Sequence, residues 1–400
     1  MMNTNLPDNW KIVHVDDICL INKNTLSEKS ADFQFKYIDL SSVKNGKILC
    51  SAPISFKESP SRARRIIRKN DIIMSTVRPN LQGFAHIDFD AQEYICSTGF
   101  AVLTVKPNTS SKFIYYCLYS KSVEMQINNM LVGSNYPAIN SSDVASLKIF
   151  LPPLPEQEKI AGILSCWDDG IEKLSQLIDK KKLQKKALMQ QLLTGKRRLK
   201  GFSTPWHEVR LGDVLYEHKE TSKGDETICS VSVHKGIIIQ IEHLGRSFAA
   251  SNTSNYNLVH YGNVVYTKSP TGEFPYGIFK QSQQRKSVIV SPLYGVFTPK
   301  TYYLGYILDV FFSYAINLNN YLKPIIQKGA KNTINITNET FLSKAIFLPG
   351  ETTEIQKLAE IFIKADEEIE LLNKKLEAFK QEKKALMQQL LTGKIRVKVN

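Results

Sequence analysis

Apolar side chains recur at alternating steps of three and four along two separate stretches of the chain. The first stretch covers residues 160–192 and the second covers residues 358–390, with the same spacing. This spacing is typical of a heptad seam, along which helices wind around each other. Each stretch is therefore predicted to form one helix of about 33 residues, roughly 50 Å long at ~1.5 Å per residue. Lys181, Lys185 and Lys383 interrupt the seam.

The two predicted helices end in the same twelve letters. Residues 185–196 and 383–394 both read Lys-Lys-Ala-Leu-Met-Gln-Gln-Leu-Leu-Thr-Gly-Lys. Because cores accept many apolar substitutes at constant volume, packing alone does not require such identity. The chain is therefore interpreted as an internal duplication. Gly195 and Gly393 suit the left-handed residue that commonly follows the end of a helix.

A block of mixed secondary structure is expected before each helix. The first block opens with Trp10-x-x-Val13-x-Val15 and the second with Trp206-x-x-Val209-x-Leu211, an alternation that predicts a short strand in each. Further strands are expected at matched places, residues 71–76, 100–104 and 149–152 in the first block and 263–268, 294–298 and 346–349 in the second, with helices at 113–130 and 302–321.

The letters between the matched strands are unrelated. Residues 56–69, which are rich in Arg, have no counterpart in residues 234–254. A shared scaffold with different loops is how one fold presents two binding surfaces. Ordinary drift of a duplicated domain is the alternative, but drift alone does not explain why the helical segments stayed alike.

Each long helix needs a partner to cover its apolar stripe. Because the chain holds two stripes, we expect the helices to pair with each other; pairing between molecules in a homodimer is the alternative. The predicted fold class is α+β, with two mixed α/β domains joined by two long antiparallel coiled-coil helices in a pseudo-twofold internal repeat. The lysines on the seam mark either a broader stripe or a surface shared with another subunit.

The formal net charge of the 400 residues is +14. Such an excess of Lys and Arg favours a polyanionic partner, although surface lysines that only confer solubility are the simpler alternative. The six cysteines show neither a Cys-x-x-Cys pair nor regular spacing, so neither zinc nor a disulfide framework is indicated. The sequence shows no signal peptide and no apolar run of the roughly 18 residues that a membrane helix needs, so we expect a cytoplasmic protein without a membrane partner.

The sequence carries no recognisable catalytic motif. It lacks a phosphate-binding loop, a dinucleotide-binding glycine motif, a Gly-x-Ser-x-Gly elbow and a His-Glu-x-x-His pair. Its one Pro-Pro pair, Pro152-Pro153, lacks the polar and aromatic neighbours expected of an amino-methyltransferase. The seven His are scattered, with none paired at metal-ligand spacing. A catalytic dyad assembled from distant residues remains open.

Polar and basic loop residues are candidates for DNA contacts, because Arg can read guanine, and Asn and Gln can read adenine. Loops also contain Asn for turn formation, and a basic run can be a solvated face. The candidates are Arg62, Arg64, Arg65, Arg68, Arg78, Asn80, Asn135 and Tyr136 in the first block, and Lys268, Arg285, Lys286, Lys328, Lys331 and Asn332 in the second.

The start and the end of the first helix together resemble a known family. Leu-Pro-Pro-Leu-Pro-Glu-Gln-Glu-Lys-Ile at 151–160, a heptad helix, and then Ala-Leu-Met-Gln-Gln-Leu-Leu-Thr-Gly resemble the specificity (S) subunit of type I restriction-modification systems. The resemblance covers the whole chain. The second copy departs at its start, where residues 348–356 read Leu-Pro-Gly-Glu-Thr-Thr-Glu-Ile-Gln.

The resemblance implies a non-catalytic subunit of a methyltransferase and endonuclease complex. Each recognition domain would bind one half of a split, asymmetric site on double-stranded DNA, and the helix pair would set the gap. Two modification (M) subunits and the restriction (R) subunits would bring S-adenosylmethionine, ATP and magnesium, so that this chain itself would hold no cofactor and no metal. The alternatives are a coiled-coil adaptor that does not bind DNA, and an enzyme with an unrecognised site.

The expected boundaries follow the duplication. Residues 1–155 form the first recognition domain, 156–197 the central helix, 198–350 the second recognition domain, 351–394 the C-terminal helix and 395–400 a tail. The repeated helix ends are candidate docking surfaces for the M subunits, through Lys185, Gln190, Gln191, Lys383, Gln388 and Gln389.

Overall fold

The computed structural model describes residues 6–26, 33–44, 46–49, 52–133, 135–246, 252–328 and 334–399. The chain divides into two compact units. Unit 1 comprises Met1–Ser175 and Lys374–Asn400, and unit 2 comprises Gln176–Asn373. Each unit therefore combines one globular block with one part of each long helix.

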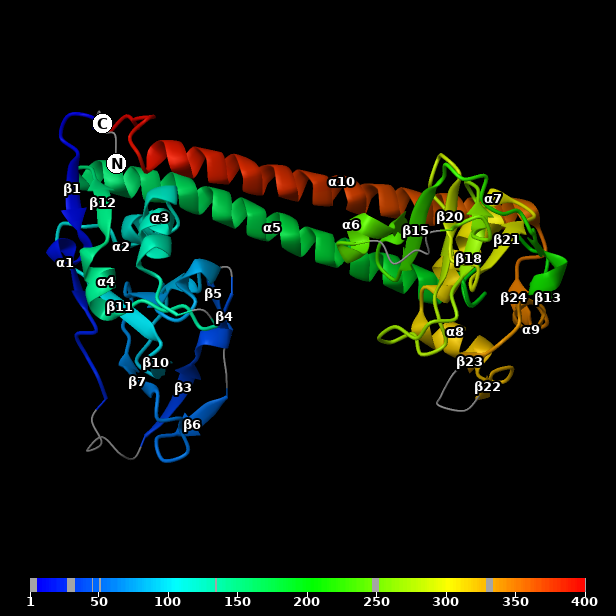
Figure 1. The fold of residues 1–400 in the computed structure, drawn as a ribbon, viewed down its shortest axis with the longest axis horizontal. Helices are drawn as coiled ribbons and strands as arrows, with labels where there is room; N and C mark the ends of the chain where they lie inside the picture. Colours follow the sequence, from blue (N-terminus) through cyan, green and yellow to red (C-terminus); the bar gives the residue numbers. More distant parts are fainter. Residues whose placement is uncertain are drawn as a thin grey trace. The chain divides into compact units, whose positions relative to one another are not determined.

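The two long helices α5 (Leu154–Leu192) and α10 (Thr352–Leu390) pack together, and the fold is α+β as the sequence predicted (Figure 1). Each helix has 39 residues, more than the expected 33 or so. The extra length of α5 lies at its start, because the segment that follows Pro153 is itself the first turn. Pro155 is tolerated there, where a backbone N–H would have no intrahelical acceptor.

The heptad seam is covered in both units. In unit 1, Trp167 of α5 meets Phe379 of α10 edge to face, with ring centroids 5.5 Å apart. In unit 2, the fully buried Phe362 of α10 belongs to the same core as Leu192 of α5. The N-terminal part of one helix thus shares a unit with the C-terminal part of the other, which is the antiparallel arrangement.

Among its described residues, the block of unit 1 contains two four-stranded sheets and two two-stranded sheets. The first sheet has the order β2-β11-β8-β9, the second β6-β3-β10-β7, and β1 pairs with β12. Their bounds are β1 Lys11–His14, β2 Cys19–Ile21, β3 Gln34–Ile38, β6 Pro53–Ser55, β7 Ala63–Ile66, β8 Ile72–Ser75, β9 Phe84–His86, β10 Tyr94–Ser97, β11 Phe100–Val105 and β12 Lys148–Leu151. Shorter elements are α1 Val15–Ile18, η1 Leu40–Ser42, β4 Val43–Lys44, β5 Lys47–Ile48, η2 Pro79–Leu81 and α4 Ser141–Ser146.

The block of unit 2 repeats the topology of the two four-stranded sheets and of the β1-β12 pair. Its sheets have the orders β14-β21-β18-β19 and β16-β15-β20-β17, and β13 pairs with β24. Their bounds are β13 His207–Arg210, β14 Leu215–Glu217, β15 Thr227–Ser232, β16 Gly236–Ile239, β17 Asn257–Val259, β18 Val264–Tyr266, β19 Phe279–Gln281, β20 Val288–Val290, β21 Gly295–Pro299 and β24 Ala345–Leu348. Shorter elements are η3 Leu211–Asp213, α6 Gln240–Leu244, β22 Gln327–Lys328, β23 Ile334–Asn335 and α9 Asn338–Leu342. The expected matched strands are confirmed, and the common frame extends to every strand of the four-stranded sheets.

Each helical stretch expected inside a block is two helices. Residues 113–130 fall in α2 (Ser111–Leu118) and α3 (Lys121–Met130), because the Ser120 side chain accepts a hydrogen bond from Val123 N and starts a second helix. Residues 302–321 fall in α7 (Tyr302–Phe312) and α8 (Ala315–Leu322).

The repeated helix ends contribute to the cores of the blocks. Leu390 and Leu391 belong to the main core of unit 1, and Leu192 and Leu193 to that of unit 2. The residues that follow turn in the predicted left-handed conformation, with φ of +68° at Gly195 and +70° at Gly393. The identical letters therefore occupy equivalent positions in the two units.

Candidate nucleic-acid interface

A buried carboxylate fixes the start of α5 in unit 1. Glu156 Oε2 accepts a hydrogen bond from Trp10 Nε1 at 3.1 Å. The Arg396 guanidinium donates to both carboxylate oxygens, at 2.7 Å from Nε and 2.9 Å from Nη2. These hydrogen bonds raise the pKa of Arg396. The segment after α10 is thus bound to the first block.

Unit 2 contains the same arrangement. Glu354 Oε2 accepts from Trp206 Nε1 at 3.2 Å, and Arg198 donates to both Glu354 oxygens, which raises the pKa of Arg198. The second helix start, which departs in letters from the Pro-Glu-Gln pattern, therefore keeps the carboxylate and its geometry. These two clusters were not predicted, although the signal was present in the matched Trp, Glu and Arg positions of the two halves.

The seam lysines of the repeat bind carboxylates within their own unit. In unit 1, Lys383 Nζ lies 2.5 Å from Asp168 Oδ1, and Tyr116 of α2 donates to Asp168 Oδ2 at 2.8 Å. Burial, and next the Asp168 charge, raises the pKa of Tyr116. The cluster ties the block to both long helices.

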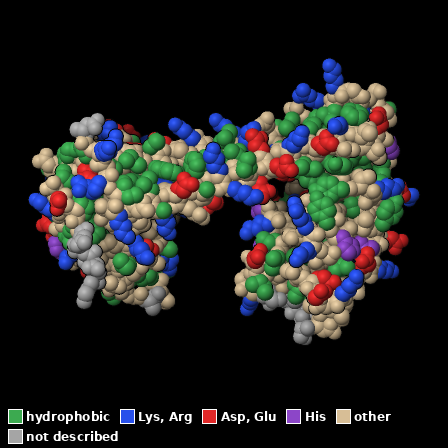
Figure 2. Space-filling model, turned by 90° about the horizontal axis from the view of Figure 1, so that it is seen from above, with side chains coloured by type: hydrophobic (Ala, Val, Ile, Leu, Met, Phe, Trp, Pro, Cys, Tyr) green, Lys and Arg blue, Asp and Glu red, His purple; other side chains and the backbone are tan. Residues whose placement is uncertain are grey.

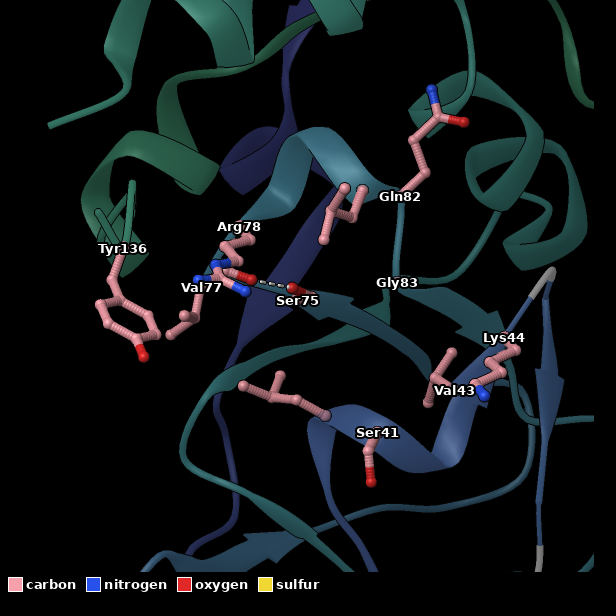
Figure 3. Close-up of a pocket in the computed structure, with 11 residues that line it drawn as sticks. Ser41, Val43, Lys44, Ser75, Val77, Arg78, Gln82, Gly83 and Tyr136 are labelled. Carbon is pink, nitrogen blue, oxygen red and sulfur yellow. Dashed lines mark hydrogen bonds between the residues drawn. The ribbon is translucent and has the colours of Figure 1, made fainter. Parts of the chain in front are cut away.

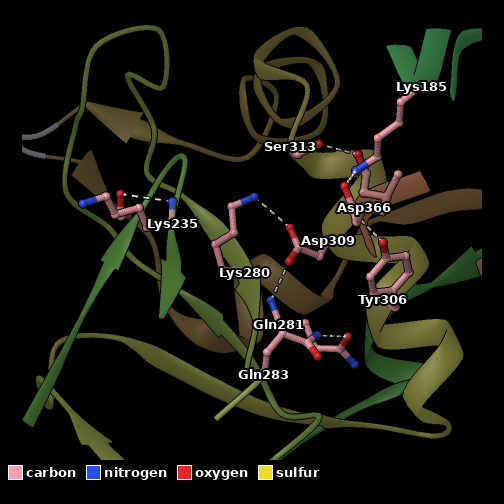
Figure 4. A network of polar contacts seen from close by, with 11 residues as sticks. Lys185, Lys235, Lys280, Gln281, Gln283, Tyr306, Asp309, Ser313 and Asp366 are labelled. Atoms are coloured by element: carbon pink, nitrogen blue, oxygen red, sulfur yellow. Dashed lines mark hydrogen bonds and ion pairs between the residues drawn. The ribbon is translucent and has the colours of Figure 1, made fainter. Parts of the chain in front are cut away.

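The equivalent cluster of unit 2 joins Lys185, Asp366 and Tyr306 (Figure 4). Lys185 Nζ lies 2.5 Å from Asp366 Oδ1, and Tyr306 of α7 donates to Asp366 Oδ2 at 2.5 Å. Only 20% of the Lys185 side chain is exposed. Both lysines proposed for docking thus also have an intrachain role, in addition to any contact with another subunit.

The glutamines of the repeat are more accessible. Gln190, Gln191 and Gln389 are exposed, while Gln388 is half-buried and accepts a hydrogen bond from Lys121 N at 2.9 Å. Gln190 Nε2 donates to Tyr314 Oη at 3.5 Å, and Gln191 Oε1 accepts from Arg197 Nη1 at 3.4 Å. These residues remain docking candidates, because an exposed amide side chain can still contact a partner surface.

The arginine run of unit 1 lies on and around β7. Arg62 and Arg68 are exposed at its two ends. Arg64 lies over the Phe56 ring at 4.7 Å, and Arg65 Nη1 donates to Thr25 Oγ1 at 3.1 Å. Because successive strand residues face opposite sides of a sheet, the run does not present one continuous basic face. Topologically, β7 corresponds to β17 in unit 2, so its strand has a counterpart although its arginines do not.

Arg78 and Tyr136 come together from two loops of unit 1. The Arg78 guanidinium lies 4.5 Å from the centre of the Tyr136 ring, and its Nη2 donates to Asn135 O at 3.2 Å. Asn80, in η2, is exposed nearby in sequence. The structure therefore gathers Arg78, Asn135 and Tyr136 of the predicted candidates into one cluster.

The candidates of unit 2 are more dispersed. Arg285 and Lys286 are exposed in the turn before β20. Lys268 is half-buried in the loop after β18, and burial lowers its pKa. Lys331 and Asn332 lie outside the described residues, as does the side chain of Lys328.

Basic side chains are spread over the visible face of both units and are interspersed with acidic ones (Figure 2). No group of His, Cys, Asp or Glu in the described ranges is placed to hold a metal ion. Within the same ranges, no helix has the length and apolar character that a bilayer-spanning segment needs.

Comparisons with known proteins agree with the duplicated fold. A family model described as the type I restriction modification DNA specificity domain matches residues 7–184. The HindI specificity subunit of Haemophilus influenzae is 30% identical over 147 residues, which cover 35% of this chain and 31% of that protein. The putative MjaX specificity subunit of Methanocaldococcus jannaschii is 25% identical and aligns over 98% of this chain and 95% of its own length.

A solved structure extends the likeness to the whole fold. The HsdS subunit of Thermoanaerobacter tengcongensis covers 98% of this chain with a TM-score of 0.51 and 21% identity. Over nearly its whole length the chain is similar to specificity subunits of type I restriction-modification systems. The family model, which describes a DNA specificity domain, covers the block of unit 1, and the block of unit 2 has the same strand order in its four-stranded sheets. We refer to the two blocks below as the recognition domains of unit 1 and unit 2.

Proposed function

We propose that each recognition domain binds one half of a bipartite, asymmetric site on double-stranded DNA. The observation that carries this proposal is that the two domains share one strand order in their four-stranded sheets but differ in the loops that connect the strands. Identical scaffolds with different loops suit two unlike half-sites. The net charge of +14 favours the phosphate contacts that supply much of the affinity for DNA.

The helix pair would set the unspecified gap between the half-sites and dock two M subunits. This docking role is supported by the identical sequence of the two helix ends, because two identical surfaces can bind two copies of one partner. Gln190 and Gln191 of one repeat, and Gln389 of the other, are exposed there. The domain boundaries proposed from the sequence serve this function: two recognition domains, each followed by a spacer helix.

The partners would supply the chemistry. M subunits would bring S-adenosylmethionine for adenine methylation, and R subunits would bring ATP and magnesium for translocation and cleavage, in the cytoplasm. The role of this chain in the reaction would be to bind and orient the DNA sequence.

The test is co-expression with the cognate M subunit in a host without adenine methylation, followed by genome-wide mapping of methylated adenines. We expect a motif of two different half-sites separated by a fixed gap. A continuous palindrome would contradict two different recognition domains, and methylation by this chain alone would contradict a non-catalytic subunit. Binding of the complex to duplex DNA should also weaken steeply as salt rises, because counterions are released on binding.

A further inference from the structure

The loop between β8 and β9 of unit 1 is equivalent in topology to the loop between β18 and β19 of unit 2. The two loops join equivalent strand pairs in equivalent four-stranded sheets, one in each unit. They comprise residues 76–83 and 267–278, and they differ in length and in letters. Arg78 lies in the first loop and Lys268 in the second. This is a place where a common scaffold carries different side chains.

The loop of unit 1 borders a cavity of about 500 Å³ (Figure 3). Lys44 and Arg78 line it, and none of its described lining residues is acidic. A second cavity in unit 1, of about 510 Å³, is lined by Asp90 and Glu93. Carboxylates repel the phosphates of DNA, so the cavity beside Arg78 is the better fit to a nucleic-acid strand.

The Arg78 side chain is held in place before any ligand binds. Its guanidinium lies over the Tyr136 ring and uses one N–H for the bond to Asn135 O. Tyr136 is 70% exposed, so the pair lies at the surface. A guanidinium has five N–H donors in a planar fork, and two parallel N–H groups match O6 and N7 of guanine.

The backbone of the loop is also fixed in an unusual conformation. Arg78 and Gln82 both adopt left-handed geometry, with φ of +49° and +54°, on either side of η2. Residues with a Cβ rarely adopt this conformation, and such strain concentrates where a side chain must be aimed. Arg78 N donates to Pro137 O at 2.7 Å, and Ser75 Oγ donates to Val77 O at 2.6 Å, which hold the loop in place.

We propose that Arg78 and Tyr136 determine specificity in the recognition domain of unit 1, with Arg78 binding the guanine edge of one base pair and Tyr136 orienting its guanidinium. This inference rests on the proposed function and assigns a base contact within the same site. Within the arginine run, Arg64 and Arg65 are less suited, because Arg64 lies over the Phe56 ring and Arg65 donates to Thr25.

The experiment maps methylated adenines for variants co-expressed with the cognate M subunit. Arg78→Ala and Arg78→Lys should lose discrimination at one guanine position of one half-site, on the order of 10- to 100-fold. The other half-site and the gap should not change. Tyr136→Leu should weaken the same position less, and Tyr136→Phe should retain it, because the phenyl ring still supports the guanidinium.

Two controls accompany these variants. Lys36→Ala removes a surface lysine that pairs with Glu93 beside the acidic cavity, and it should leave the whole motif unchanged. Lys268→Ala changes the equivalent loop of unit 2, and its effect should fall in the opposite half-site. If the Arg78→Ala chain does not fold, Arg78→Lys decides the question, because it keeps the positive charge but not the planar fork.

The outcomes separate the two proposals. If the wild-type complex yields no bipartite motif, the proposed function fails. If it yields one and both Arg78 variants keep every position, Arg78 does not read a base. If Arg78→Lys weakened methylation of all DNA sequences equally, the inference would likewise be overturned, because a uniform loss would indicate a phosphate contact.

Discussion

Arg198 and Glu354 form a two-pronged ion pair, with Arg198 Nε 2.8 Å from Glu354 Oε1 and Arg198 Nη2 2.7 Å from Glu354 Oε2. The Glu354 side chain is only 1% exposed. Removing the arginine would leave a carboxylate buried without its counter-charge, which is strongly unfavourable. Arg396 and Glu156 repeat the relationship in unit 1.

Arg198→Met should therefore lower the urea midpoint of unfolding more than the double variant Arg198→Met/Glu354→Met does. The double variant removes both charges, and paired apolar replacements of a buried ion pair are often nearly neutral. Chemical denaturation followed by tryptophan fluorescence reports the change, because Trp206 belongs to the cluster. Arg396→Met provides the matched variant in unit 1. If the double variant were the least stable, the pair would stabilise the fold by its own attraction instead.

The two helix-terminal glycines should respond unequally to alanine. Both have left-handed φ, so either substitution should cost about 1–2 kcal/mol in backbone strain. A Cβ on Gly195 would lie 3.6 Å from the Trp206 ring, an ordinary contact, whereas a Cβ on Gly393 would lie 2.5 Å from Pro7 Cγ. Gly393→Ala should therefore destabilise more than Gly195→Ala. Calorimetric melting of both variants measures this order, and equal losses would show that Pro7 moves aside without cost.

Much of this fold could be predicted from the sequence, because its repeats are local and periodic. The heptad spacing predicted α5 and α10, and Gly195 and Gly393 marked their ends. The contact of Glu156 with Arg396 could not be predicted in this way, because it joins residues far apart in the chain. The pairing of Lys185 with Asp366 is similar: its only sequence signal is that both residues recur at the same spacing in the other half, as Lys383 and Asp168.

Acid should destabilise unit 1 through His86. Its Nε2 lies 2.9 Å from Ser111 Oγ, and burial, with the Lys112 charge as the second cause, lowers its pKa. The fold therefore favours the neutral ring relative to the unfolded chain, where the pKa is about 6.5. This contribution is present above pH ~6.5 and is lost as pH falls through the lower, folded-state value.

His86→Asn, which cannot gain the proton, should thus lose less stability between pH 7.5 and pH 5 than the wild-type chain. Thermal melting at the two pH values measures the difference. Carboxylates titrate in both proteins, so their contribution to the loss of stability cancels in the comparison. Parallel pH profiles for the two proteins would show that His86 protonation does not contribute to acid sensitivity.

The spacer role predicts a change of gap without a change of sequence read. Seven residues inserted after Gln176 and again after Lys374, at equivalent places in α5 and α10, would keep the heptad register in both helices. Each insertion adds about 10 Å at ~1.5 Å per residue, and about 3 base pairs span that length at ~3.4 Å each. An insertion after Thr194 would not serve, because α5 ends at Leu192.

Methylation mapping should therefore show both half-sites unchanged and a gap about 3 base pairs longer. The control inserts seven residues in α5 alone. This single insertion should reduce both stability and methylation, because α10 would then be too short to pack against the lengthened α5 along the whole apolar seam. If the variant with both insertions recognised different bases in either half-site, or kept the original gap, the helix pair would not be the element that sets the spacing.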